Sequence, residues 1–144
     1  MTRAQLYLFM GNNDLAVVSS LSLAGKPQSA VVAFAVTEDL EIVFDTFRSS
    51  RKYRNLLANG HASVVIGWDG DQTVQMEGRA YLLEGEELIQ YRRTYAAKWP
   101  ESQMRQGWSG LMHFVIRPEW VRYSDYGHRP PVVHEEVMDA RMGL

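Results

Sequence analysis

The sequence predicts a mainly β protein, an antiparallel β-barrel of six to seven strands in a Greek-key-like order with short α-helices at its ends. Three observations support this fold class. Short apolar segments, some with period-two patterning, recur along the chain, tight turns join many of them, and only a few segments have helical spacing. The chain has 144 residues, of which 46% are hydrophobic, so we expect a single domain over residues 1–144.

The first third of the chain predicts one helix and three strands. Thr2 and Gln5 have the spacing of a capping box and Gly11 follows the segment, so we expect a helix over residues 3–10. The strands are expected over residues 15–23, 28–37 and 41–45. The second strand is apolar on both faces, which predicts that it is covered on both sides.

The middle of the chain predicts two helices, over residues 50–59 and 85–98, and two strands, over residues 61–68 and 72–83. Ser49 or Ser50 can cap the first of these helices. The turn residues 69–71 join the two strands into a hairpin. Pro100 ends the second helix.

The last third predicts two closing strands, residues 111–117 and 120–124, which are separated by Pro118. Residues 126–144 contain two consecutive prolines, and we expect them to form an extended C-terminal arm that could carry a short helix near its end.

Composition excludes several classes of site and partner. No cysteine is present, which removes disulfides, thiolate metal sites and cysteine nucleophiles. The formal net charge of −2 provides no overall attraction to nucleic acid or to an anionic membrane. The start of the chain lacks the pattern of a signal peptide, and no apolar run approaches the roughly 20 residues that cross a bilayer. We therefore expect a soluble, cytoplasmic protein.

One segment is strongly basic in an otherwise mildly acidic chain: four cations lie within seven residues, namely Arg48, Arg51, Lys52 and Arg54. Arg51 and Lys52 fall in the first turn of a predicted helix, where the helix dipole disfavours each cation by about 0.3–1 kcal/mol. A bound phosphate would reverse this cost, because free backbone N–H groups, serine hydroxyls and cations would all surround it. A solvated basic face is the alternative explanation.

Other motifs are weaker. The chain has no nucleophile triad, paired-carboxylate signature, phosphate loop or zinc-binding helix motif. The four histidines lack the spacing of metal ligands, and we predict no metal site: His61, His113, His128 and His134. Trp99 and Trp108 flank a polar, irregular stretch and are candidate pocket walls.

Several segments together resemble the pyridoxamine 5′-phosphate oxidase-like superfamily of flavin-binding split barrels. In chain order these segments are VVAFAV, EIVFDTFRSSRKYRNLLANGHASVVIGW and TVQMEGRAYLL. They follow that family's pattern, in which a strand that ends in Thr is followed by Ser, Arg, Lys and a short helix. A later strand in the pattern ends in Glu-Gly. YAAKWPES and HFVIRPEWVRYSD are similar to its lid helix and closing strands. The resemblance spans nearly the whole chain and implies a split β-barrel of the FMN-binding type.

This resemblance also implies a site: FMN at a homodimer interface, with its phosphate held by Thr46, Ser50, Arg51 and Lys52. It further implies that the backbone around one strand residue and polar side chains after the hairpin lie near the flavin; here these are Phe34, Gln72, Thr73 and Gln75. Which of the three polar residues faces the flavin depends on strand register.

The departures from the family define the expected function. True pyridoxamine phosphate oxidases carry basic residues where this chain has Ala30 and Ala35, and a C-terminal Arg-Leu-His-Asp-Arg segment that is missing here. The chain is therefore similar to the shorter, general members. We expect an FMN-dependent oxidoreductase of unknown substrate and unknown catalytic residues. The alternatives are a non-catalytic flavin or haem carrier and a deazaflavin-dependent reductase.

Overall fold

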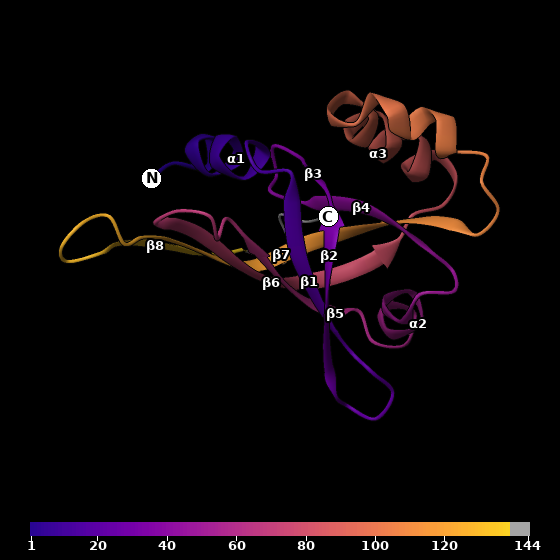
Figure 1. Ribbon diagram of the computed structural model, residues 1–144, viewed down its shortest axis with the longest axis horizontal. Helices are drawn as coiled ribbons and strands as arrows, with labels where there is room; N and C mark the ends of the chain where they lie inside the picture. The colour runs from indigo at the N-terminus through magenta and orange to yellow at the C-terminus, as the bar shows by residue number, and fades with distance from the viewer. Residues whose placement is uncertain (139–144) are drawn as a thin grey trace.

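The computed structural model describes residues 1–138 and consists of one curled antiparallel sheet with three α-helices at its ends (Figure 1). Its elements in chain order are α1 (Arg3–Gly11), β1 (Leu15–Leu21), β2 (Pro27–Ala33), β3 (Ala35–Val36), β4 (Ile42–Phe47), α2 (Arg51–Ala58), β5 (His61–Ile66), β6 (Gln72–Leu82), α3 (Gly85–Lys98), the 3₁₀ helix η1 (Pro100–Arg105), β7 (Leu111–Asp125) and β8 (Val132–Val137).

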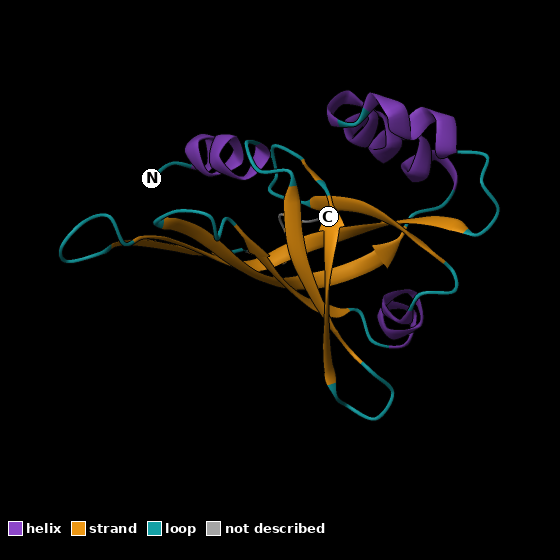
Figure 2. Cartoon of the chain, in the orientation of Figure 1, coloured by secondary structure: helices purple, strands orange, loops and turns teal. Residues whose placement is uncertain are grey.

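The sheet is a half-barrel with an open seam. Its strand order is β2-β1-β5-β6-β7-β4-β3, and β8 pairs with the far end of β7. The strands β2 and β4 approach each other without pairing, so the barrel is split between them. Figure 2 shows the strong curl of the sheet. The predicted antiparallel split barrel is confirmed.

The core lies inside the half-barrel. Phe44 of β4 and Phe114 of β7 are fully buried, and their rings stack with centroids 5.8 Å apart. Leu6 and Met10 of α1 close one end and are likewise fully buried. Burial of each such side chain contributes about 1.5–3 kcal/mol to the free energy of folding. This cluster therefore holds in place the strands that border the seam.

The predicted helices are confirmed. Thr2 and Gln5 form a complete capping box at the start of α1. Ser50 caps α2, because its side chain accepts a hydrogen bond from the Tyr53 N–H. The amphipathic segment before Pro100 forms α3, which packs a second buried cluster against the outside of β4 and β7.

The predicted strand over residues 28–37 is broken at Phe34 into β2 and β3. The expectation that this strand is covered on both faces is wrong for β2, because other residues of the same chain cover only one of its faces. β2 is an end of the sheet, and only its inner face packs on the core. Val32 is therefore 7% exposed while its neighbour Val31 is 59% exposed.

The predicted separation of the closing strands at Pro118 is also wrong, because β7 is continuous. Glu77 pairs with Trp120 while Gly78 pairs with Pro118, so Glu119 bulges out of the ladder. A bulge accommodates a proline, which has no N–H to donate. A Cβ on Gly78 would lie 2.2 Å from the Arg117 carbonyl oxygen, so only glycine permits this close approach.

The described part of the predicted extended arm over residues 126–144 contains a strand that was not expected. Residues 132–137 form β8, which pairs with β7 and projects as a hairpin at the left of Figure 2. The Arg122–Glu135 ion pair, 3.0 Å, joins the two strands. With β3 and β8 the described residues form eight strands, more than the six to seven predicted. The short helix near the end falls in residues 139–144, outside the described residues. Across residues 1–138, every helix is too short or too polar to cross a membrane.

Candidate cofactor cleft

The open seam forms a cleft of about 380 Å³. One wall is residues 31–33 of β2, and the other is Asp45–Phe47 of β4 together with Leu111 of β7. The start of α2 closes one end with Ser49, Ser50 and Lys52. A volume of this size is within the range of natural small-molecule sites.

The strand β4 and the helix α2 meet in a hydroxyl pair. The side chains of Thr46 and Ser50 share a hydrogen bond of 2.9 Å, and Thr46 is 6% exposed. The first N–H groups of a helix have no partner within the helix, and those of α2 begin beside this pair. Hydroxyls and free N–H groups together are donors for an anion.

Lys52 provides a cation on the same wall. It is half-buried, and burial lowers the pKa of its ammonium group while nearby Asp45 raises it. The first turn of α2 contains no acidic residue. The positive end of the helix dipole and the lysine ammonium would therefore both attract an anion in the cleft.

Arg51 faces a different space from Thr46 and Ser50. It lines a smaller pocket of about 100 Å³ on the β1 and β2 side of α2, where Lys52 is also found. Lys52 is thus the residue shared by the cleft and the smaller pocket, and Arg51 is exposed and lines the smaller pocket.

Asn55 anchors the helix and was not predicted. Its side-chain amide donates to Ser20 Oγ at 3.1 Å and to Gln28 Oε1 at 2.9 Å, and the residue is 6% exposed. These bonds tie α2 to β1 and β2, which sets the distance between the two walls of the seam. A single asparagine in a short polar helix gives no signal in the sequence.

Asp45 is a second residue that sequence reasoning missed. It lines the cleft, yet its Oδ2 atom is buried and has no hydrogen-bond partner. Arg105 Nη2 of η1 lies 3.9 Å from this oxygen. Burial raises the pKa of the Asp45 carboxyl, and the charges of Arg105 and Lys52 partly oppose that rise.

His113 of β7 lies beside Asp45 as its cross-strand neighbour. The His113 residue is 3% exposed. Burial, together with the charges of Arg92 and Arg105, lowers the pKa of His113 to about 4, so the imidazole is neutral near neutral pH. The Tyr95 ring of α3 packs edge-on against it at 6.1 Å, and burial raises the pKa of this tyrosine to about 12.

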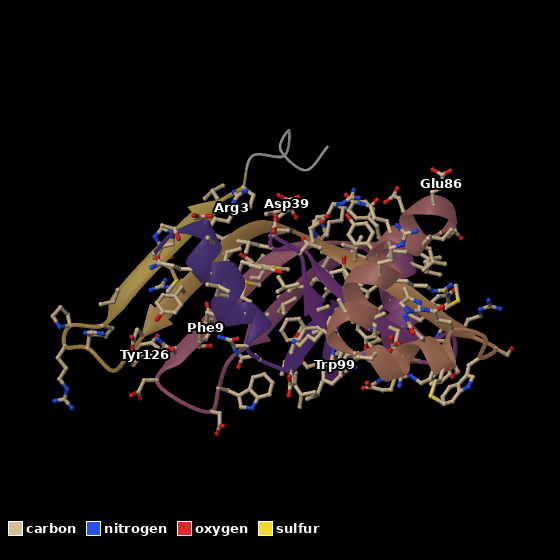
Figure 3. The ribbon with its side chains drawn as sticks, turned by 90° about the horizontal axis from the view of Figure 1, so that it is seen from above. Arg3, Phe9, Asp39, Glu86, Trp99 and Tyr126 are labelled. Atoms are coloured by element: carbon tan, nitrogen blue, oxygen red, sulfur yellow. The ribbon has the colours of Figure 1, made fainter. Side chains whose placement is uncertain are left out.

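Phe34 lies in the core and does not line the cleft. It is fully buried, its N–H donates to the Asp14 carbonyl and its carbonyl accepts from Trp99 Nε1 at 2.8 Å. Both backbone groups therefore have partners within the chain, and the preceding residues of β2 form the wall. Trp99, at the end of α3, is labelled in Figure 3.

The three polar residues of β6 are not brought to the cleft of their own chain. Gln72 donates to the Tyr123 hydroxyl at 2.8 Å, and Thr73 donates to the Ile66 carbonyl at 3.4 Å. Gln75 is exposed on the outer face of the sheet, opposite Val65.

Of the two tryptophans predicted as pocket walls, Trp108 lies at the cleft edge. It is 54% exposed and stacks on Phe47, which lines the cleft, with ring centroids 6.4 Å apart. Trp99 packs instead in the cluster beneath α3.

Comparison with known proteins gives one family match. A family model described as pyridoxamine 5′-phosphate oxidase matches residues 4–125, which include the whole cleft. No curated protein matches the sequence.

Solved structures share the fold at low sequence identity. A haem-binding protein from Mycobacterium smegmatis has a TM-score of 0.79 and 18% identity, over 95% of this chain and 58% of its own. HutZ, the haem storage protein of Vibrio cholerae, has a TM-score of 0.72 and 16% identity, over 81% of this chain and 89% of its own. A pyridoxamine 5′-phosphate oxidase-related, FMN-binding protein from Nostoc punctiforme has a TM-score of 0.67 and 12% identity, over 94% of each chain. This chain thus spans little more than half of the Mycobacterium protein.

Proposed function

Because this chain belongs to the pyridoxamine 5′-phosphate oxidase family, we propose that it binds FMN in the seam cleft and acts as an FMN-dependent oxidoreductase on a small molecule. The observation that carries this proposal is the anion cradle, which consists of the Thr46–Ser50 hydroxyl pair, Lys52 and the start of α2. The FMN-binding relative from Nostoc punctiforme supports the choice of cofactor.

The residues of the cleft fit FMN. The cradle offers hydroxyls, backbone N–H groups and a half-buried ammonium to a phosphate monoester. Arg51 adds a cation in the neighbouring smaller pocket, and residues 31–33 of β2 give an apolar wall that excludes water. Bound FMN would supply hydride or electron transfer, while the protein provides binding, orientation and a dry environment.

We further propose that two copies of the chain form a homodimer through the outer face of the sheet. Val31, Val17 and Val65 lie directly opposite one another on β2, β1 and β5 and make an apolar row on that face. Val31 is 59% and Val65 36% exposed, and Val31 also lines the cleft. Covering this row with a second copy would bury apolar surface and place the second chain beside the cleft.

This dimer accounts for one of the three polar residues of β6, Gln75. Gln75 lies directly opposite Val65, next to the end of the apolar row. Its exposed side chain points away from the cleft of its own chain. In a symmetric dimer the same face of the second copy meets this face, so a Gln75 side chain can approach the cofactor of the other subunit. A Val65→Glu variant should be monomeric by light scattering, and a wild-type monomer at micromolar concentration would refute the interface.

Haem binding is the second candidate, because two structural relatives are a haem-binding and a haem storage protein. An axial histidine is the usual haem ligand. Within residues 1–138, however, no histidine lines the cleft: His113 is buried behind Asp45, and His61 lies against Arg79 at 3.2 Å. The cleft therefore favours the flavin over the haem.

A deazaflavin reductase would need further cations for the longer anionic tail of its cofactor. Arg48 and Arg54 are the available ones, and Arg48 already contacts Met112 Sδ at 3.7 Å. This arrangement favours the shorter phosphate of FMN.

The deciding experiment is a visible absorption spectrum of the purified protein before and after separate additions of FMN, deazaflavin and haem, each followed by gel filtration. We expect a flavin spectrum that stays with the protein. A retained haem band with no retained flavin would replace the proposal with haem handling, and retained deazaflavin alone would replace it with deazaflavin chemistry.

A further inference from the structure

The carboxyl group of Asp45 lies in an unusual place for a site that binds an anion. Asp45 is adjacent to Thr46 on β4 and is one of the residues that line the cleft together with Ser50 and Lys52. Successive strand residues face opposite sides, so its carboxyl lies on the side of β4 that faces α3 and η1, away from the Thr46 hydroxyl. Its Oδ2 atom is buried and accepts no hydrogen bond, since the nearest cation, Arg105 Nη2, is 3.9 Å away. A buried carboxylate oxygen without a donor is costly, and such an atom usually has a functional or solvent-related explanation.

The groups around Asp45 come from four elements. Lys52 of α2 and Arg105 of η1 are the cations that act on it. His113 of β7 is its cross-strand neighbour and is neutral near neutral pH, since its pKa is lowered to about 4. Tyr95 of α3, whose pKa is raised to about 12, is neutral as well. The balance of burial and these charges already raises the pKa of Asp45 before any ligand enters.

A phosphate in the cradle changes this balance. Its negative charge would compete with the Asp45 carboxylate for Lys52, inside a half-buried cleft where charges are weakly screened. Protonation of the carboxyl would remove the repulsion between the two negative charges. Protonation at this residue and anion binding in the cradle therefore favour each other.

We propose that Asp45 takes up a proton when a phosphate monoester enters the cradle, so that this residue sets the affinity of the cleft for FMN and the pH range in which FMN is held. The inference rests on the proposed FMN site. It assigns to Asp45 a role in cofactor affinity and none in the chemistry of the flavin.

The test compares wild type with Asp45→Asn, an isosteric change that removes the charge. FMN affinity is measured by quenching of flavin fluorescence between about pH 5.5 and about pH 8.5, because a raised carboxyl pKa moves the titration of Asp45 toward neutral pH. The second ionisation of the phosphate affects both proteins equally and cancels in the ratio of their affinities. Asp69→Asn, at an exposed hairpin position, is the matched control.

We expect Asp45→Asn to bind FMN about tenfold or more tightly than wild type at the upper end of the range and by a smaller factor at the lower end, since a shift of one pKa unit equals a tenfold change. Riboflavin, which lacks the phosphate, should show no such difference. Calorimetry in two buffers of different ionisation enthalpy should show proton uptake with FMN in wild type that is smaller in Asp45→Asn.

Two results would overturn the inference, and they are distinguishable. Equal FMN affinity of wild type and Asp45→Asn at every pH would remove the role of Asp45 and leave the FMN site intact. Absence of FMN binding by either protein would remove the proposed function and this inference with it. Thermal melting of both variants checks the fold, and Asp45→Ser serves as a second neutral variant.

Discussion

Reversal of the two cations at the start of α2 is the most direct test of the cradle. In the Arg51→Glu/Lys52→Glu variant, Lys52, which lines the cleft, and Arg51, which lines the neighbouring pocket, both change from attracting to repelling the phosphate. A hydrogen bond to a charged group contributes about 1.5–3 kcal/mol. Lys52 is half-buried, so we take the upper part of this range, whereas Arg51 is exposed and solvent screens it to the lower part. The sum, about 4 kcal/mol, corresponds to a roughly thousandfold weaker Kd before any repulsion is added.

The assay is FMN titration by fluorescence quenching, combined with gel filtration of the mixture. The matched control is Lys26→Glu/Arg93→Glu, which changes the net charge equally at two exposed positions outside the cleft. We expect the control to retain FMN and the test variant to lose it. Glutamates in the first turn suit the helix dipole, so α2 should remain folded, and circular dichroism checks this.

FMN affinity within about threefold of wild type in the test variant would refute the cradle, since that change corresponds to less than 1 kcal/mol. A new glutamate at position 52 would lie near Asp45, so a loss of fold is tested separately with Lys52→Gln. This single change removes one cation without adding a charge, and it should still weaken FMN binding by one to two powers of ten, or about 1.5–3 kcal/mol.

Three further predictions concern the framework of the site. Asn55→Ala should lower the free energy of unfolding by about 2–3 kcal/mol in denaturant melts, because it leaves Ser20 and Gln28 without their shared donor, and it should weaken FMN binding as the seam loosens. Gly78→Ala should destabilise the fold by about 3 kcal/mol or more, because its Cβ would clash with the Arg117 carbonyl oxygen, whereas Gly70→Ala, with no atom within 4 Å, should melt like wild type. The third concerns pH: His113 has a pKa lowered to about 4 in the folded chain, so the unfolded chain, with a value of about 6.5, binds more protons between these values. Stability should therefore fall as the pH drops through this window, by up to about 3 kcal/mol, and urea melts of His113→Gln should lack that part of the pH dependence.

Local signals in the sequence were sufficient for the helix that carries the cradle. The capping serine, the cations of the first turn and the preceding strand all lie within ten residues, so their arrangement follows from helix geometry alone. The hairpin of β5 and β6 was equally local, since the turn residues between the two strands fix their pairing.

The errors concern features that depend on distant parts of the chain. Val31 and Val32 have the same residue type, and the first is exposed because it faces the outer side of the sheet, which no other described element covers at β2 and β5. β8 was missed because two consecutive prolines favour an extended arm, whereas its residues pair with residues of β7 that lie seven to seventeen positions earlier. Asp45 was missed for the same reason: its burial is created by η1 and β7, which no local pattern places beside it.

The seam links cofactor binding to association. Because β2 and β4 do not pair, the barrel leaves open a cleft whose β2 wall includes Val31, and the same residue begins the apolar row on the outer face. A second copy that covers the row would also close the side of the cleft, while an FMN molecule that touches both copies would hold them together. Each event then favours the other by the same free energy, as linkage requires. A split barrel of this type is therefore expected to associate most tightly when its cofactor is bound, and a variant that weakens the cradle at Lys52 should also weaken the dimer, although Lys52 is not part of the apolar row.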